Sequence, residues 1–562
     1  MTDPLVRHYG DSGILVDLGS VHAAHRVAEA IQAAVDADDL GGRVIGVAVG
    51  FGNVVVLLDH PDGPEGSLLS WVERVVLRSL EPDRASLGGS PAGGAGPGPG
   101  SMEIPVVFDG PDLPLVAAAI GADELDVAEL LTRADLEVAF IGFAPGFPYL
   151  TGLPPELARI PRRATPRPSV PAGSVAIAAG FASVYPRATP GGWMLVGSTT
   201  ARLFDPDCPP YARVRAGDRV RFRRTTDGGQ RAHGDPEGQR PPLQARGGRW
   251  AEVVDPGLVT LVQDQGRRGV AGIGVPGAGA SDPDGLLLAN RLVGNPDCAA
   301  VLELSARGPA LRFAVGVHVA VVGCQSGAVD VELDGRPCPD STVVPVGPGQ
   351  VLAVGRVHTG LRACLAVSGG FETRVVMGSR SSDVLTGLGL GPLRVGDRLE
   401  LGASVRPRGS LLGTGATFAR PRAVRVLAGP RHVAGPAWAQ LLEDRWTVDV
   451  ASNRIGVRLV GTGGPLPAGP GEAASTGMIT GAVQVPPDGQ PIILLPDHAT
   501  VGGYPVIACV ITADRSLVAQ LAPGDALTFI GVDRAGAHRA WTERDRVLDG
   551  RVAGWFPTAT GI

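Results

Sequence analysis

Glycine and proline recur every few residues over 140–193, and large aromatic side chains stand between them. Proline fixes the backbone torsion φ and removes a hydrogen-bond donor, whereas glycine permits conformations that other residues avoid. We therefore expect this stretch to be loop-rich, bent backbone packed on its rings. With 82 glycines and 50 prolines among 562 residues, the chain as a whole favours turn-rich β structure over a helical bundle.

The chain contains no lysine, so its 50 basic side chains are all arginine. A Walker A loop, a pyridoxal Schiff base, a biotin attachment and a Ser-Ser-Lys amidase all need a lysine and are excluded within this chain. The net charge of -6 argues against a nucleic-acid surface. Because there is no CxxC pair, no signal peptide and no apolar run of membrane-spanning length, we expect a reduced, cytoplasmic protein without membrane contacts.

Composition divides the chain into modules and linkers. Residues 1–85 alternate β-rich runs with amphipathic helical stretches and predict an α+β domain. Residues 86–101 hold seven glycines and three prolines, so we expect a disordered or extended linker. The next module covers 102–225, and a polar linker covers 226–249. The rest is predicted as two related β-barrel subdomains, about 250–415 and 416–545, and a tail at 546–562.

Short phrases repeat along the chain. AGDRVRF from Ala216 is echoed by VGDRLEL from Val395 and PGDALTF from Pro523. VPAGSVAIA from Val170 is echoed by VPPDGQPIILL from Val485, and each is followed by Tyr-Pro. A Gly-Asp turn before alternating apolar residues predicts a turn into a strand. The echoes therefore predict recurring β modules, each with the same closing strand.

Longer motifs resemble a known family. FIGFAPGFPYL from Phe140, PRRATPR from Pro161 and YPRATPGGW from Tyr185 resemble the B component of bacterial 5-oxoprolinase, also called allophanate hydrolase subunit 1 or KipI. TLVQDQGRRG from Thr260, with GSRSS, SNRIG and VGGYP further on, resembles the C component, also called allophanate hydrolase subunit 2 or KipA. The chain thus resembles a fusion of 5-oxoprolinase subunits B and C, related to the C-terminal part of urea carboxylase and urea amidolyase.

The resemblance implies a fold and an activity. The fold would be mainly β, with an α+β N-terminal domain and cyclophilin-like β-barrel modules. The activity would be ATP-dependent opening of 5-oxo-L-proline to L-glutamate, with ATP and Mg²⁺, together with a separate chain, the 5-oxoprolinase A component. The alternatives are a non-catalytic regulator of the kinase-inhibitor type and a component of a urea- or allophanate-type amide-metabolising enzyme. The oligomeric state stays open, a homo-oligomer included.

Candidate site residues follow from the absence of lysine. Phosphoryl transfer needs fixed positive charge, which arginine must supply here. We predict phosphate or carboxylate contacts by arginines and Mg²⁺ contacts by carboxylates, with a surface ion pair as the competing interpretation for each arginine. The residues are Arg162, Arg163, Arg167, Arg267 and Arg380, and Asp264, Asp282 and Asp497.

Several other motifs carry no assignment. Ser12 in a GDSG motif lacks the surrounding elements of a serine protease, and GIGVPG from Gly272 lacks those of a dinucleotide fold. His498 stands beside Asp497 in a suggestive loop, yet the histidines show no metal-ligand spacing, so no dedicated metal site is predicted. No catalytic nucleophile is assigned, and we expect the chain to be inactive without the A component.

The sequence also departs from the family pattern at polar positions. The family resemblance leads us to expect polar groups where this chain has Leu131, Phe181, Ala182, Ser198 and Ala499. An amide or guanidinium that is lost takes its hydrogen bonds with it. We therefore predict a preserved fold with an altered site.

Overall fold

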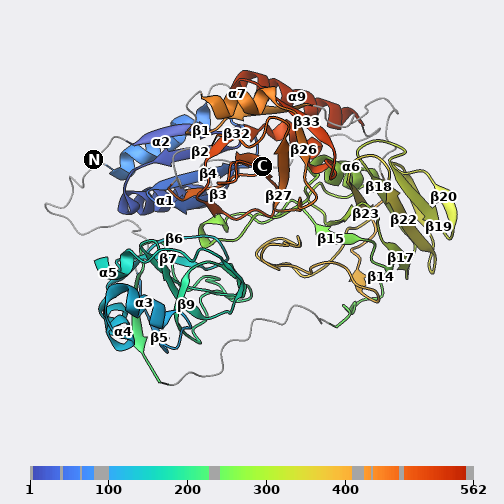
Figure 1. Ribbon diagram of the computed structural model, residues 1–562. Helices are drawn as coiled ribbons and strands as arrows, with labels where there is room; N and C mark the ends of the chain where they lie inside the picture. Colours follow the sequence, from blue (N-terminus) through green and yellow to red (C-terminus); the bar gives the residue numbers. More distant parts are fainter. Residues whose placement is uncertain are drawn as a thin grey trace.

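The computed structural model describes residues 4–37, 42–63, 66–80, 100–226, 241–407, 423–431, 435–467 and 474–551. Four β-rich parts follow one another along the chain (Figure 1), and the predicted mainly β class with an α+β N-terminal part is confirmed. Residues 81–99, most of the predicted first linker, lie outside the described residues, as do 227–240 and 552–562. None of the described helices has the length and apolar character that crossing a membrane requires.

The N-terminal part is an antiparallel sheet with the strand order β1-β2-β4-β3 and two helices. Its elements are β1 Leu5–Tyr9, β2 Gly13–Asp17, α1 Val21–Asp36, β3 Val44–Gly50, β4 Asn53–Leu58 and α2 Ser67–Leu80. Alternate strand residues point to opposite faces. Val54 and Val56 therefore pack with Val27 and Ile31 of α1, while Val55 faces the other way, onto Met478 of the C-terminal part. Both faces of this sheet are covered.

The second part is a seven-stranded sheet with the order β12-β9-β10-β7-β6-β13-β5. Hydrogen bonds between Val107 and Ser198 join its two edges, so the sheet curls into a barrel, which we call the first barrel. Its strands are β5 Ser101–Val106, β6 Leu136–Ile141, β7 Pro148–Thr151, β9 Ser174–Ala178, β10 Phe181–Val184, β12 Met194–Ser198 and β13 Arg219–Arg224. Beside them lie the pair β8 Arg167–Val170 and β11 Thr189–Gly191, and the helices α3 Leu113–Ile120, α4 Glu124–Arg133 and α5 Pro155–Ala158.

The stretch 140–193 is loop-rich, as predicted, and short strands of the first barrel lie between its loops. Strands β7 to β11 all lie in this stretch. They are three to five residues long, and β9 is buried at every position, so no alternation of apolar and polar residues marks it in the sequence. The glycines and prolines separate short strands.

The third part, for which a β-barrel subdomain over about 250–415 is predicted, has two sheets. One sheet has the order β20-β19-β22-β17-β14-β24 and the other β15-β16-β23-β18-β21. Apolar residues of both sheets, such as Phe313 and Leu365, share one core, so the sheets pack face to face as a sandwich.

The elements of this sandwich are β14 Trp250–Asp255, β15 Val259–Gln263, η1 Ala271–Ile273, α6 Pro283–Val293, β16 Val301–Ser305, β17 Ala310–Phe313, β18 Val317–Val322, β19 Val329–Leu333, β20 Arg336–Cys338, β21 Val343–Val346, β22 Val351–Val357, β23 Arg362–Val367 and β24 Arg398–Glu400. Helix α6 begins where Asp282 and Pro283 predict it, because the Asp282 carboxylate accepts a hydrogen bond from the Gly285 N–H.

The fourth part is a closed barrel with the order β25-β32-β29-β30-β27-β26-β33, which we call the second barrel. Its elements are β25 Ala423–Ala428, α7 Pro436–Glu443, β26 Trp446–Val448, β27 Gly456–Gly461, β28 Thr476–Gly477, β29 Ala482–Gln484, β30 Ile492–Leu494, β31 Val501–Gly502, β32 Val506–Val510, η2 Thr512–Asp514, α8 Arg515–Ala519 and β33 Ala526–Gly531. Helix α9, Arg534–Arg551, follows and runs past the boundary placed at 545.

The two barrels have the same connectivity. The first and last strands pair in parallel in each, β5 with β13 and β25 with β33, and every later neighbour corresponds in chain order. The Gly-Asp echoes therefore mark the same closing strand in both barrels. The second echo does not mark corresponding strands. VPAGSVAIA covers β9 and VPPDGQPIILL covers β30, whereas the strand orders of the two barrels make β9 correspond to β29.

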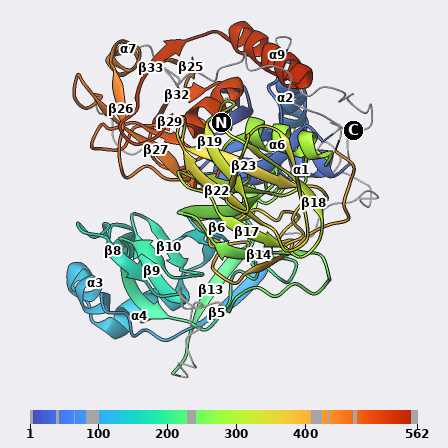
Figure 2. The same cartoon turned by 90° about the vertical axis from the view of Figure 1, so that its right-hand side faces the viewer.

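The second barrel lies against the N-terminal sheet, and the first barrel lies on another side of that sheet (Figures 1 and 2). The contact with the second barrel is tight. A Cβ atom added at Gly477 of β28 would lie 2.8 Å from the Val55 Cβ, and one added at Gly10 would lie 3.0 Å from the Cys509 Cβ. Residues separated by most of the chain are thereby brought together.

Candidate functional site

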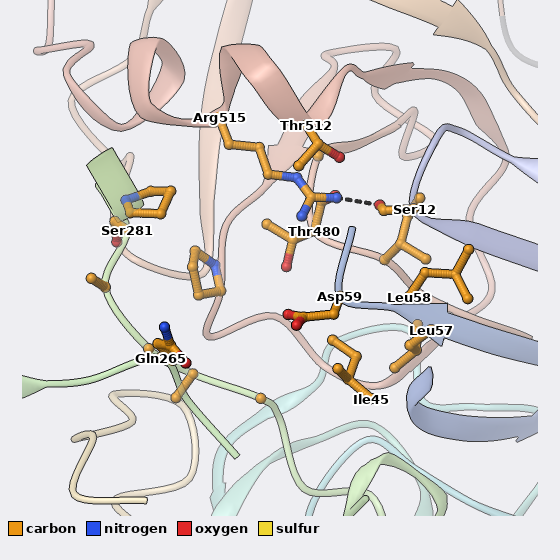
Figure 3. Close-up of a pocket in the computed structure, with 18 of the residues that line it drawn as sticks. Ser12, Ile45, Leu57, Leu58, Asp59, Gln265, Ser281, Thr480, Thr512 and Arg515 are labelled. Carbon is orange, nitrogen blue, oxygen red and sulfur yellow. Dashed lines mark hydrogen bonds between the residues drawn. The ribbon is translucent and has the colours of Figure 1, made fainter. Parts of the chain in front are cut away.

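A cavity of about 940 Å³ lies where the N-terminal sheet, the sandwich and the second barrel meet. Its wall is built by the end of β4, the 264–283 loop, α6, the end of β30, the start of α8 and one face of α9. Figure 3 shows Arg515 reaching from the second barrel toward Ser12, with Ile45, Leu57 and Asp59 of the N-terminal sheet nearby.

Arg515 places a positive charge at this cavity. Its Nη2 donates to the Thr480 carbonyl at 2.9 Å and to the Ser12 hydroxyl, and its buried Nε has no hydrogen-bond partner among the described residues. Burial lowers the pKa of the guanidinium, and the nearby Asp11 opposes this effect. Because Asp11 already accepts two hydrogen bonds of 2.8 Å from Thr512, Arg515 retains donor capacity toward an anionic ligand.

Ser12 lies on the turn between β1 and β2, which the positive φ of Gly10 allows. Its side chain is 3% exposed, and its hydroxyl oxygen faces the Arg515 guanidinium. Within the described part of the chain no histidine forms a hydrogen bond with this hydroxyl. The GDSG motif therefore helps to position Arg515 and lacks the base that a serine nucleophile needs.

His498 lies in the same wall. Its Nδ1 is 2.8 Å from the Ala499 carbonyl, which can only accept, so Nδ1 carries the proton. Burial lowers the pKa of His498. Thr500, two residues after His498, is 4% exposed, and its hydroxyl has no hydrogen-bond partner among the described residues. Both side chains offer polar groups beside Arg515.

Three of the predicted site residues meet at one loop cluster. The Asp264 carboxylate accepts hydrogen bonds of 2.6 Å from the Ser379 and Ser381 hydroxyls and one of 2.7 Å from the Arg380 N–H. Arg267 donates to the Val376 and Ser381 carbonyls, and the Arg380 side chain pairs with Glu372. Asp264 and Arg267 line the cavity, but their hydrogen bonds hold the 376–382 loop.

The other two predicted carboxylates are buried behind this wall. Asp497 forms two 3.0 Å hydrogen bonds with Arg454, which also donates to Ser281 and pairs with Glu303. Asp282 caps α6 and accepts from Gln520 at 2.6 Å. Burial raises the pKa of Asp282 to about 6, and the Asp284 charge adds to this.

These carboxylates do not fit a magnesium site. The oxygens of Asp264, Asp282 and Asp497 already accept hydrogen bonds from the protein, and Asp497 is neutralised by Arg454. No group of three or more His, Cys, Asp or Glu side chains in the described ranges could hold a metal ion. Any Mg²⁺ would have to arrive with a nucleotide.

The arginines of the first barrel lie elsewhere, and two of them form ion pairs, the competing interpretation of these arginines. Arg163 and Arg167 both donate to Asp112 Oδ1 at 2.8 Å. Burial alone would raise the pKa of Asp112, but hydrogen bonds from Arg167 and Leu195 and the charges of both arginines hold it below its ordinary value. Arg162 is exposed on the same segment, near the Tyr149 and Tyr185 rings. The wall of the cavity contains none of the three.

Comparison with known proteins matches both halves. The family model "Carboxyltransferase domain, subdomain C and D" matches residues 4–214, and "Carboxyltransferase domain, subdomain A and B" matches residues 273–531. The chain is 34% identical over 303 residues to the 5-oxoprolinase C component of Escherichia coli K12, covering 53% of this chain and 96% of that protein. It is 42% identical over 188 residues to the 5-oxoprolinase B component of Escherichia coli O157:H7, covering 32% and 78%.

The chain belongs to the carboxyltransferase-domain family of 5-oxoprolinase subunits B and C, as a fusion of the two. The crystal structure of TTHA0988 matches nearly all of it, with a TM-score of 0.78 and 32% identity over 94% of this chain and 100% of that one. Urea amidolyase of Lachancea kluyveri is 30% identical over 338 residues, which are 55% of this chain and 18% of that protein.

In this fused B and C chain, the cavity draws on both halves. Ser12 and Asp59 come from the B-like half, whereas His498, Thr500 and Arg515 come from the C-like half. The sequence patterns predict a ligand contact for none of these five residues. Ser12 and His498 carried weak local signals, but Arg515 carried none, because it is one of 50 arginines and lies in a short helix.

The departures from the family pattern also fall away from the cavity. Leu131 and Ala182 are fully buried in the core of the first barrel, and Phe181 packs on Tyr149 and Trp193. Of the five changed positions, Ala499 is nearest to the site, since its carbonyl orients His498. Leu131, Phe181 and Ala182 thus have packing contacts, whereas the Ser198 hydroxyl donates to Asp109 at 2.8 Å.

Proposed function

We propose that this chain is the combined B and C component of an ATP-dependent 5-oxoprolinase. In this proposal the cavity binds 5-oxo-L-proline, and a separate A component is required for ring opening to L-glutamate. The observation that carries the proposal is Arg515, a half-buried cation with spare donors on a cavity wall shared by both halves. The names of the relatives, 5-oxoprolinase subunits B and C, support the substrate.

The ligand has features that suit this wall. 5-Oxoproline carries a carboxylate, a cyclic amide and an apolar ring edge. A guanidinium binds a carboxylate with charge-assisted hydrogen bonds, so Arg515 is assigned to the carboxylate. The unpartnered Thr500 hydroxyl is available to the amide, and Ile45 and Leu57 offer an apolar wall to the ring.

The proposed reaction needs ATP because the amide is a poor electrophile. Transfer of a phosphoryl group to its oxygen turns the ring carbon into a centre that water can attack. The cavity of about 940 Å³ is near the upper end of the ~300–1,000 Å³ typical of ligand sites and exceeds the needs of one small ring. This volume supports a nucleotide beside the amide, with any Mg²⁺ carried on its phosphates.

Reconstitution tests the proposal. The purified chain, a 5-oxoprolinase A component and ATP are combined, and glutamate released from 5-oxoproline is measured. We expect release only when all three are present, and a loss of at least about 100-fold in Arg515→Gln. Unchanged glutamate release by Arg515→Gln would contradict the assignment of the cavity. No release with any A component would favour the regulatory alternative.

A second function has one observation in its favour. The matching family models are described as carboxyltransferase domains, and a urea amidolyase is among the relatives. A component of a urea-type amide-metabolising enzyme would use the same cavity for a neutral amide. Calorimetry with urea separates the two functions, since urea has no carboxylate and its affinity would be insensitive to Arg515→Gln.

A further inference from the structure

We propose that His498 is the proton acceptor for the N–H group of the bound amide and that its Nε2 atom selects ligands carrying both a carboxylate and an adjacent N–H. This inference rests on the proposed function, because it names the group that completes the same site. It adds a catalytic residue and a definition of the substrate class.

The tautomer of His498 is fixed by its surroundings. The Ala499 carbonyl accepts the Nδ1 hydrogen at 2.8 Å, so the lone pair of the neutral ring is on Nε2. No residue of the described chain forms a hydrogen bond with Nε2. The side chain lines the cavity although it is only 8% exposed.

The ring is also held in the neutral form. Burial lowers the pKa of His498, and the positive charge of Arg515 acts in the same direction. The hydrogen bond to the Ala499 carbonyl raises the pKa but does not outweigh burial. The negative charge of Asp497 raises the pKa of His498, but the Asp497 carboxylate is neutralised by two hydrogen bonds with Arg454. A neutral imidazole at ordinary pH is ready to accept a proton.

The backbone around His498 is fixed as well. The His498 N–H donates to the Leu495 carbonyl at 3.0 Å, and the Asp497 N–H donates to the Arg454 carbonyl at 3.3 Å. Arg454 is 5% exposed and binds the segment before α6 through the Ser281 hydroxyl and the Gly279 carbonyl. The imidazole therefore keeps its place relative to the cavity without help from a ligand.

Arg515 and His498 together define a ligand with two features. The guanidinium supplies donors for a carboxylate, and Nε2 supplies an acceptor for a donor group. A cyclic amide with a carboxylate on the carbon next to nitrogen presents both features within one small ring. An amide alkylated on nitrogen lacks the donor and therefore forms no hydrogen bond with Nε2, which costs affinity.

The proton transfer balances as follows. The amide oxygen forms a bond to the γ-phosphorus of a nucleoside triphosphate, and the bond from that phosphorus to the diphosphate leaving group breaks. The nitrogen becomes iminium-like, so its N–H is far more acidic than in the free amide. The N–H bond breaks, its electron pair stays on nitrogen, and the proton goes to Nε2. The imidazolium can return this proton to nitrogen when the ring opens.

Paired ligands and variants test this role. Calorimetry measures the affinities of 5-oxo-L-proline and its N-methyl derivative for the full wild-type chain, for His498→Asn and for Arg515→Gln. We expect the wild-type chain to prefer the N–H ligand by at least about 10-fold and His498→Asn to lose that preference. With the A component and ATP, turnover of His498→Asn should fall about 10²-fold or more. Nitrogen NMR should show the Nδ1–H tautomer at neutral pH and a shift of Nε2 on ligand addition.

Each outcome decides one claim. If His498→Asn keeps both the preference and the turnover, His498 is structural and this inference is overturned while the proposed function stands. If the wild-type chain binds neither ligand, the proposed function fails and the inference fails with it. Circular dichroism of His498→Asn checks its fold. If that variant is unfolded, the NMR measurement on the wild-type chain decides, and an Nε2 signal that does not move with ligand overturns the proposal.

Discussion

The two barrels share one connectivity, yet only the second borders the cavity. In the first barrel, β8 carries Arg167, whose charge is balanced by Asp112 at the start of α3. In the second barrel, the corresponding β28 packs on β3 and β4 of the N-terminal sheet. The barrel architecture is therefore common to both. The cavity borders only the second barrel, whose β28 packs on the N-terminal sheet.

The equivalent aromatic residues show the same difference. Trp193 follows β11 of the first barrel and Tyr504 follows β31 of the second. Trp193 is 7% exposed and packs on Phe147 and Tyr149, with ring centroids 5.6 Å apart in both pairs, whereas Tyr504 is 43% exposed. The first barrel buries its rings among themselves at this end, and the second barrel leaves the corresponding position open.

The largest expected effect on stability comes from the ion pairs behind the second barrel. Arg454→Met leaves Asp497 buried without its cation and leaves Glu303 with Arg362 alone. We expect a loss of about 3–5 kcal/mol in the free energy of unfolding, measured by denaturant titration. The matched change in the first barrel, Arg163→Met, breaks a half-buried pair and should cost about 1 kcal/mol or less. Equal losses would contradict the comparison.

The next effect depends on pH. The pKa of Asp282 is about 6 in the folded chain, above its ordinary value, because burial disfavours the charge. The folded state then binds the proton more tightly than the unfolded state, so this group's contribution to stability falls as pH rises through about 4 to 6. In Asp282→Asn, the free energy of unfolding should fall by up to about 3 kcal/mol less over the same pH rise. Unfolding curves at about pH 4.5 and 7.5 for both proteins check it, and identical pH profiles would refute it.

The docking of the second barrel on the N-terminal sheet can be tested by adding one methyl group. Gly477→Ala would place a Cβ 2.8 Å from Val55 and 3.0 Å from Ala48, which forces the sheet and the barrel apart. We expect a loss of about 1–3 kcal/mol and weaker ligand binding in the cavity. Gly192→Ala is the control in the first barrel, since its nearest neighbour is at an ordinary 3.6 Å. Similar melting temperatures for the two variants would argue against a tight interface.

The smallest expected effect concerns the arginines of the first barrel. Arg167→Gln removes one of the two arginine hydrogen bonds to Asp112, while Arg163 and the Leu195 N–H keep theirs. We expect a change of about 1 kcal/mol or less in stability and unchanged affinity for 5-oxoproline and ATP. Calorimetry with both ligands checks this. A clear loss of ATP affinity would instead support phosphate binding by this segment.

Local signals allowed much of the fold to be predicted. The apolar spacing over 21–35 predicts α1, and Asp123 predicts the start of α4, where it forms a capping box with Asp126. The turn residues at 50–53 predict the β3–β4 hairpin. Each of these signals acts over a few residues, so the sequence contains all the information that the element needs.

The sandwich and the cavity could not be predicted in this way. Whether the strands of 250–401 close into a barrel depends on edge pairing between distant strands, which no local pattern encodes. Arg515 and Ser12 form a hydrogen bond although 503 positions separate them in the sequence, and Arg163 and Asp112 form one over a separation of 51 positions. An arginine that binds a ligand and one that pairs with a buried aspartate look the same in sequence, because the difference lies in the tertiary neighbours.

The most direct test of the shared cavity is a crystal structure of the full chain with saturating 5-oxo-L-proline. We predict ligand density in the cavity between the N-terminal sheet and the second barrel, with the carboxylate on Arg515 and the ring nitrogen toward His498. Density on Arg163 or Arg167 of the first barrel, with the Arg515 cavity empty, would contradict it.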